Sequence, residues 1–146
     1  MDVASLLKKR PAGVIGILGT APLEECVEIL VENNYGALLV FNEHDKVIGI
    51  ISERDIMHGL VKWGTLALNH HVSELMTGKL VSCRLHDKLQ DLLPIMIDRS
   101  FRHLPVIERG EPLGMISMRD LARERISEME LEANVLRDMA ATHQPN

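Results

Sequence analysis

Two short segments of the chain carry a serine, an arginine and an aspartate at the same spacing. Each serine follows a short apolar run that is typical of a buried strand, and it stands where a helix would begin. The free N–H groups of a first helical turn suit a phosphate, to which the serine adds a hydroxyl and the arginine a positive charge. The aspartate could accept hydrogen bonds from both hydroxyls of a ribose. The residues are Ser52, Arg54 and Asp55 in the first segment and Ser117, Arg119 and Asp120 in the second.

The same spacing has a second interpretation that needs no ligand. Ser-x-x-Asp is close to the capping box, in which a serine and an acidic residue three positions later satisfy each other's backbone N–H groups at a helix start. The residues of one segment alone leave both interpretations open.

The two segments belong to a longer internal repeat. The stretch 47–55 returns as 112–120, with Gly49 and Gly114, the serines, the arginines and the aspartates all 65 residues apart. Four identities at one offset within one apolar pattern indicate a duplication. The missing side chain at Gly49 would let a ligand or a neighbouring strand come close.

The composition restricts the class of protein. The chain has 146 residues, of which 46% are hydrophobic and 3% aromatic, so we expect an aliphatic, Met-rich core. A net charge of −5 and the scarcity of aromatics argue against a nucleic-acid surface. No apolar run is long enough to span a bilayer, and the first residues lack a leader pattern. Cys26 and Cys83 lie far apart and are expected to be reduced thiols of a cytoplasmic protein.

Apolar spacing and turn residues predict the same order of elements in both halves, namely strand, helix, strand, strand, helix. Pro94 falls inside one expected helix, so a kink or a later start is expected there. The turn of the second hairpin is one residue shorter than that of the first. The first half has a lead-in helix at 3–9, a strand at 14–18, a helix from about 20 to 33, strands at 37–41 and 46–51 and a helix at 53–63; the second has a lead-in at 72–76, a strand at 80–84, a helix at 87–99 and strands at 103–108 and 112–116.

Each half is too small to bury its own apolar faces well, so we expect the two to pack together as an α+β fold. The expected units are residues 1–64, residues 65–125 and a C-terminal helical extension at 126–146.

The helix expected from Met118 onward carries an apolar pattern that two arrangements could explain. The helix could fold back on its own domain, or it could pair with a second subunit as a short coiled coil. The spacing of 4, 3, 4, 3 and 4 residues runs through Ala122, Ile126, Met129, Ala133, Leu136 and Ala140.

The repeated motif and the order of elements resemble a tandem pair of cystathionine-β-synthase (CBS) domains, the Bateman module. The resemblance covers about 3–125. It is carried by the stretches 36–40 with 49–55 and 102–106 with 114–120, and by the lead-in 72–77 of the second repeat.

The resemblance implies two intertwined β-α-β-β-α repeats with pseudo-two-fold symmetry. It also implies clefts between the repeats that bind AMP, ADP or ATP, or alternatively S-adenosylmethionine or NAD, in a homodimer that regulates an unidentified partner protein. The implied ligand residues are Ile15, Gly36, Ala37, Ser52, Arg54 and Asp55 in the first repeat and Val81, Arg102, His103, Pro105, Ser117, Arg119 and Asp120 in the second.

The two expected sites differ in charge. Arg102 and His103 precede the second hairpin, whereas Gly36 and Ala37 occupy the matching positions of the first. The sequence therefore favours the second-repeat site for an AMP-like ligand.

Other functional classes have less support in the sequence. No catalytic constellation is recognisable, so an enzyme is not expected, and the adjacent His70 and His71 lack the further ligands that a metal site needs. A structural dimer or adaptor without a ligand remains the alternative to a nucleotide sensor.

Overall fold

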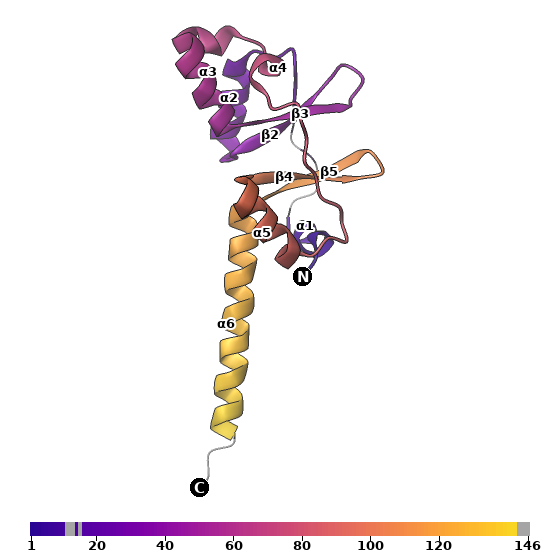
Figure 1. Cartoon of the computed structure of the whole chain (residues 1–146), viewed down its shortest axis with the longest axis vertical. Coiled ribbons are helices and arrows are strands. Elements are labelled where there is room, and N and C mark those ends of the chain that lie inside the picture. The colour runs from indigo at the N-terminus through magenta and orange to yellow at the C-terminus, as the bar shows by residue number, and fades with distance from the viewer. Residues whose placement is uncertain (11–13, 15, 143–146) are drawn as a thin grey trace.

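The computed structural model describes residues 1–10, 14 and 16–142 (Figure 1). The two halves form separate lobes that are stacked on each other, and one long helix projects from the second lobe. Apart from the linker helix η1 and the missing strand at 80–84, the elements follow the expected order. They are α1 (Val3–Lys8), β1 (Gly16–Leu18), α2 (Leu23–Asn33), β2 (Ala37–Phe41), β3 (Val47–Ser52), α3 (Glu53–Trp63), the 3₁₀ helix η1 (Gly64–Asn69), α4 (Val72–Leu75), α5 (Leu89–Arg99), β4 (His103–Glu108), β5 (Glu111–Ser117) and α6 (Met118–Thr142).

The first lobe is built on a three-stranded sheet in the order β1-β2-β3. Strand β2 pairs parallel with β1 and antiparallel with β3, and β2 is buried along most of its length. Helix α2 supplies the crossover that parallel strands require. The hairpin predicted over 37–51 is therefore confirmed.

The second lobe repeats the hairpin but not the first strand. Strands β4 and β5 pair antiparallel, and their register shifts after Val106, at the position equivalent to the shift after Val40 in the first hairpin. The strand predicted at 80–84 is wrong, because the segment makes one isolated parallel bridge, between Cys83 and Val106.

Proline explains why that strand does not extend. The Cys83 N–H donates to the Pro105 carbonyl, and the Ile107 N–H donates to the Cys83 carbonyl. The next bond of a parallel ladder would come from the N–H of residue 105, which proline lacks. At the other end, the Leu85 N–H donates to the Glu108 carboxylate and not to a strand carbonyl.

The lead-in helices are exchanged between the lobes. Val3 and Leu6 of α1 are buried in the core of the second lobe, while Val72 and Leu75 of α4 are buried in the core of the first. Each lobe thus borrows apolar side chains from the other half of the chain, which ties the two repeats together. The intertwined arrangement is confirmed.

Both cores are aliphatic, as the composition predicts. Cys26 lies in the first core and Cys83 in the second, and both thiols are free. Helix α5 begins at Leu89, two residues later than expected, and continues through Pro94 to Arg99.

Helix α6 is one continuous element of 25 residues. Its first turns pack on α5 and β5, and the remainder projects away from both lobes (Figure 1). Of the two arrangements considered for this helix, folding back on its own domain therefore applies only to those first turns. In the described part of the chain, no helix is both long enough and apolar enough to cross a membrane.

Candidate functional site

The first Ser-x-x-Asp segment lies where β3 passes into α3. Ser52 is the N-cap residue of α3, and its N–H donates to the Asp55 carboxylate at 2.9 Å. The Ser52 hydroxyl also donates to that carboxylate, at 3.1 Å, and accepts a long bond from the Asp55 N–H. The capping box is therefore present, and it holds both side chains at the start of the helix.

A second contact fixes the other oxygen of the Asp55 carboxylate. Thr77, just after α4, donates its hydroxyl to Asp55 at 3.0 Å, and its backbone exchanges two hydrogen bonds with Ile50. This approach needs glycine at position 49, because a Cβ there would lie 2.8 Å from the Thr77 carbonyl oxygen. Gly49 thus admits the backbone that follows α4, which makes an isolated bridge with β3 and is not the strand that the sequence suggested.

A cleft of about 300 Å³ opens beside this segment, between the two lobes. Its lining comes from both repeats and from the link between them. The first repeat contributes Gly36, Ile50, Ser52, Glu53, Arg54 and Asp55; the link and the second repeat contribute Thr77, Lys79, Val81, Arg99, Ser100, Phe101, Arg102 and His103.

The cleft has an excess of positive charge in a chain of net negative charge. Four basic side chains line it, against the two carboxylates of Glu53 and Asp55. All four are exposed to solvent, so an anion that enters the cleft can reach them. They are Arg54, Lys79, Arg99 and Arg102.

The His103 imidazole lies at the contact between the lobes. A Cβ on Gly36 would lie 2.9 Å from its Nε2 atom and 3.1 Å from the Glu53 carboxylate, so the missing side chain leaves room for both groups. Burial lowers the pKa of His103 and outweighs the opposing charge of Glu53. The imidazole is therefore neutral near pH 7 and can both donate and accept a hydrogen bond.

The second Ser-x-x-Asp segment has the same cap but different surroundings. The Ser117 N–H and hydroxyl each donate to the Asp120 carboxylate at 2.7 Å. Arg10, which follows α1, forms an ion pair with the same carboxylate and donates to the Met115 carbonyl at 2.7 Å. Burial alone would raise the pKa of Asp120, but the bonds from Arg10 and Ser117 outweigh it and lower the pKa.

The structure groups the expected ligand residues differently from the sequence. Gly36, Ser52, Arg54 and Asp55 of the first repeat share the cleft with residues of the second, which are Val81, Arg102 and His103. The sequence assigned these residues to two separate sites. The resemblance implied clefts between the repeats, but not which residues of the two repeats share this one.

The other expected residues lie away from this cleft. Ala37 and Pro105 are buried within β2 and β4, and Ser117 and Asp120 bond to each other and to Arg10. Arg119 is exposed on the first turn of α6. Ile15 lies outside the described residues.

Sequence reasoning missed several residues of the cleft, chiefly Thr77, Lys79 and Arg99. Arg99 ends α5, and Thr77 and Lys79 follow the short α4. One signal was available, since Thr77 belongs to the lead-in stretch that supports the family resemblance. Of the two histidines considered for metal, His70 stacks on Trp63 with ring centroids 3.9 Å apart and hydrogen-bonds Glu74.

Comparison with known proteins agrees with the duplication. The CBS domain family model matches residues 6–62 and again residues 72–127. A curated protein of Acidianus ambivalens, an uncharacterised 17.7 kDa protein, is 34% identical over 102 residues, which cover 69% of this chain and 60% of that protein. The mitochondrial CBS domain-containing protein CBSX3 of Arabidopsis thaliana is 31% identical over 108 residues, 71% of this chain and 52% of that protein. The matched part of the chain thus spans less than two thirds of either relative.

Solved structures show the same fold. A CBS-domain containing protein from Agrobacterium tumefaciens superimposes with a TM-score of 0.81 at 31% identity, over 85% of this chain and 92% of that one. A CBS domain pair solved in complex with 5′-methylthioadenosine and S-adenosyl-L-methionine has a TM-score of 0.77 at 19% identity, over 88% of this chain and 98% of that one, which shows the fold alone. With two family matches in tandem and this shared architecture, the chain belongs to the CBS-domain family.

Proposed function

We propose that the cleft between the lobes binds an adenine nucleotide of the AMP, ADP or ATP class and that binding regulates a partner protein. One observation carries the proposal: the cleft joins the start of α3, with Ser52 and Asp55, to four basic side chains from both repeats. A helix N-terminus with arginines beside it suits a phosphate, and a carboxylate suits ribose hydroxyls.

The size of the cleft favours a small ligand. Its volume of about 300 Å³ lies at the lower end of the ~300–1,000 Å³ that ligand pockets usually have. A mononucleotide fits that volume better than NAD.

The charge of the cleft distinguishes a nucleotide from S-adenosylmethionine as its ligand. A structural neighbour of this chain was solved with S-adenosyl-L-methionine, so that ligand is the second candidate here. Its sulfonium is cationic, whereas the cleft has four basic and two acidic side chains. The excess of positive charge favours the anionic phosphate.

The regulatory part of the proposal rests on family membership. CBS pairs are generally non-catalytic regulatory modules, and we extend that role to this chain as a cytoplasmic homodimer that acts on a partner. A ligand can regulate only if it binds one conformation or assembly more tightly than another. A dimeric adaptor with no ligand is the competing function.

Isothermal titration calorimetry with AMP, ADP, ATP, NAD and S-adenosylmethionine tests the binding. We expect saturable binding of at least one adenine nucleotide, and a loss of roughly 10–100-fold in affinity for Asp55→Asn, as expected when hydrogen bonds to a charged group are removed. Asp120→Asn is the matched control, because it breaks an equivalent helix cap outside the cleft.

Three results would count against the proposal. Binding of none of the nucleotides would favour the adaptor. Tighter binding of S-adenosylmethionine than of any nucleotide would change the ligand class. Equal effects of the two substitutions would mean that Asp55 acts only through the helix cap.

A further inference from the structure

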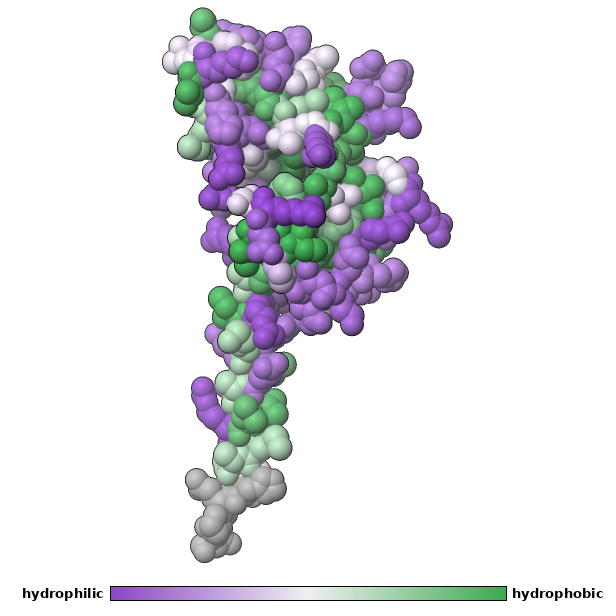
Figure 2. All heavy atoms as spheres, viewed as in Figure 1, coloured by the Kyte–Doolittle hydropathy of each residue, from purple (hydrophilic) through white to green (hydrophobic). Residues whose placement is uncertain are grey.

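The projecting part of α6 leaves large apolar side chains in solvent. Ile126, Met129 and Leu136 are 57%, 53% and 66% exposed, and Ala122 is exposed as well. Figure 2 shows apolar residues along much of the projecting helix, far from either lobe. An apolar stripe of this length on an exposed helix is usually covered by a partner.

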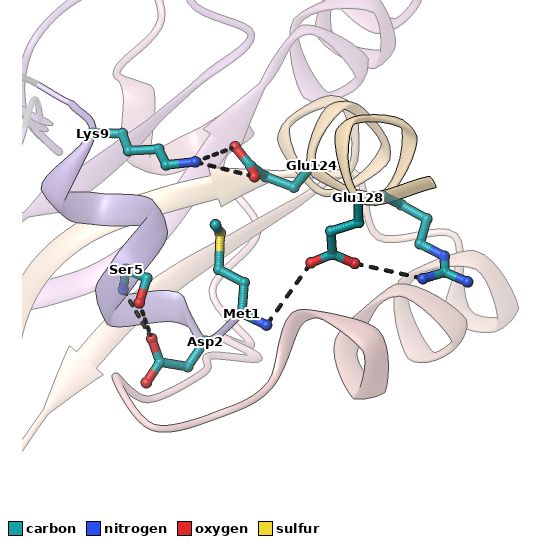
Figure 3. Close-up of polar contacts among 7 residues, drawn as sticks. Met1, Asp2, Ser5, Lys9, Glu124 and Glu128 are labelled. Atoms are coloured by element: carbon teal, nitrogen blue, oxygen red, sulfur yellow. Dashed lines mark hydrogen bonds and ion pairs between the residues drawn. The ribbon is translucent and has the colours of Figure 1, made fainter. Parts of the chain in front are cut away.

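The side of α6 that faces its own lobe is a different one. Leu121 is buried, Glu124 pairs with Lys9 at 3.3 Å, and the Met1 amino group lies 3.8 Å from Glu128 (Figure 3). At roughly 100° per residue, the apolar stripe that runs through Ala122, Ile126, Met129 and Leu136 lies about a third of a turn away from these residues. Among the described residues, the contacts between α6 and its own lobe therefore leave the stripe free.

The stripe has the spacing of a coiled-coil seam. The positions that a heptad labels a and d alternate three and four residues apart, and the larger seam residues include a β-branched one at a and a leucine at d, which favours two strands in parallel dimers. The a positions are Ile126, Ala133 and Ala140, and the d positions are Ala122, Met129 and Leu136.

Charged residues beside the stripe select one orientation of the partner. In a parallel pair, each g position faces the e position five residues later in the other helix, which matches Arg125 with Glu130 and Glu132 with Arg137. Both pairs join opposite charges, and each pair occurs twice because the dimer has two-fold symmetry.

An antiparallel pair of helices would instead bring like charges together. With the seams centred on each other, g positions would face g positions and e positions would face e positions. Glu130 and Glu132 would then each meet their own copy, and Arg123 would meet Arg137. Like charges at such positions oppose pairing.

We propose that α6 forms a parallel two-stranded coiled coil with α6 of a second copy of this chain. The inference rests on the homodimer of the proposed function but not on its nucleotide. Because α6 begins directly after Ser117, parallel pairing brings the Ser-x-x-Asp segment of the second repeat in each chain to the same end of the coil.

Dimer strength measured on the full chain by analytical ultracentrifugation tests the seam. Leu136→Asp is expected to raise the dimer dissociation constant at least tenfold. Leu131→Asp is the matched control, since Leu131 is 65% exposed and lies on the same helix outside the stripe. A monomeric wild-type chain would overturn the homodimer and the coil together. A dimer weakened equally by both substitutions, or by neither, would overturn the coil and leave the homodimer standing.

A charge exchange tests the assignment of Glu132 and Arg137. Glu132→Arg is expected to weaken the dimer, and the double variant Glu132→Arg with Arg137→Glu is expected to restore it. The two residues are five positions apart, so they are not neighbours on one helix and the rescue must act between chains. Failure of the second substitution to restore the dimer would overturn the assignment.

Cross-linking tests the orientation. Ala140→Cys is expected to give a covalent dimer under mild oxidation, because an a position meets its own copy in a parallel coil. The native thiols do not interfere, since Cys26 and Cys83 are buried. A cross-link that forms only in a mixture of the Ala122→Cys and Ala140→Cys chains, or in neither test, would overturn the parallel arrangement.

Discussion

Arg10 forms an ion pair with Asp120, although 110 residues separate them in the sequence. The guanidinium meets the carboxylate that would bind ribose in the second repeat, and it also holds the Met115 carbonyl. In the first repeat the equivalent carboxylate, on Asp55, is met by the shorter Thr77, which leaves it on the wall of the cleft. The two repeats share a motif but differ in what covers it.

Removing the Arg10 guanidinium should expose a second nucleotide site. We expect the wild-type chain to bind one nucleotide per chain and Arg10→Ala to bind two, with the number of sites measured by calorimetry. Lys9→Ala is the control, because the neighbouring Lys9 pairs with Glu124 and not with Asp120.

Two nucleotides bound to the wild-type chain would refute this role of Arg10. One nucleotide bound to both the wild-type chain and Arg10→Ala would mean that something other than the guanidinium closes the second site.

Stability should depend on pH through His103. Its pKa is lowered in the folded state by burial, so on acidification the unfolded chain takes up the proton first, near the ordinary value of about 6.5. Its contribution to the free energy of unfolding is therefore fully present above that pH and is lost as the pH falls. Urea unfolding between pH 8 and 5 should show a smaller loss for His103→Gln than for the wild-type chain. The control is His58→Gln, which removes an exposed imidazole. An equal reduction of the acid-induced loss of stability in that variant would argue against assigning the pH dependence to His103.

Adding a methyl group at position 36 should damage the cleft. In Gly36→Ala the new Cβ would lie 2.9 Å from His103 Nε2 and 3.1 Å from Glu53, so one of these groups must move. We expect a loss of stability of about 1–3 kcal/mol, the usual cost of overpacking, together with weaker nucleotide binding. Gly78→Ala is the control, because the new Cβ would lie 4.0 Å from its nearest neighbour, the Ile48 carbonyl oxygen. Unfolding and calorimetric titration measure both effects, and unchanged values in Gly36→Ala would contradict the close contact.

Both native thiols should react slowly with thiol reagents. Burial raises the pKa of Cys26 to about 11 and that of Cys83 to about 12, so little of the reactive thiolate exists at pH 8. A colorimetric thiol assay should count both groups promptly in denaturant and neither promptly in the native chain. Rapid reaction of the native chain would indicate that one core opens readily.

Much of the fold followed from local patterns. The hairpin 37–51 and the helix 53–63 appeared as predicted, because apolar periodicity and turn residues act over a few neighbours. The strand predicted at 80–84 failed because its pairing depended on Pro105, which lies in the partner strand. A missing donor across a ladder cannot be recognised from the segment itself.

The sequence by itself determined the duplication, the Ser-x-x-Asp segments and the family, since these depend on residue types at fixed spacing. Only the tertiary structure decided which residues share a cleft. Because α1 and α4 exchange between the lobes, Thr77 meets Asp55 and Arg10 meets Asp120, and the cleft combines Asp55 with residues of the second repeat. Such contacts join residues far apart in the chain, and their geometry is set by packing between elements, which no local pattern encodes.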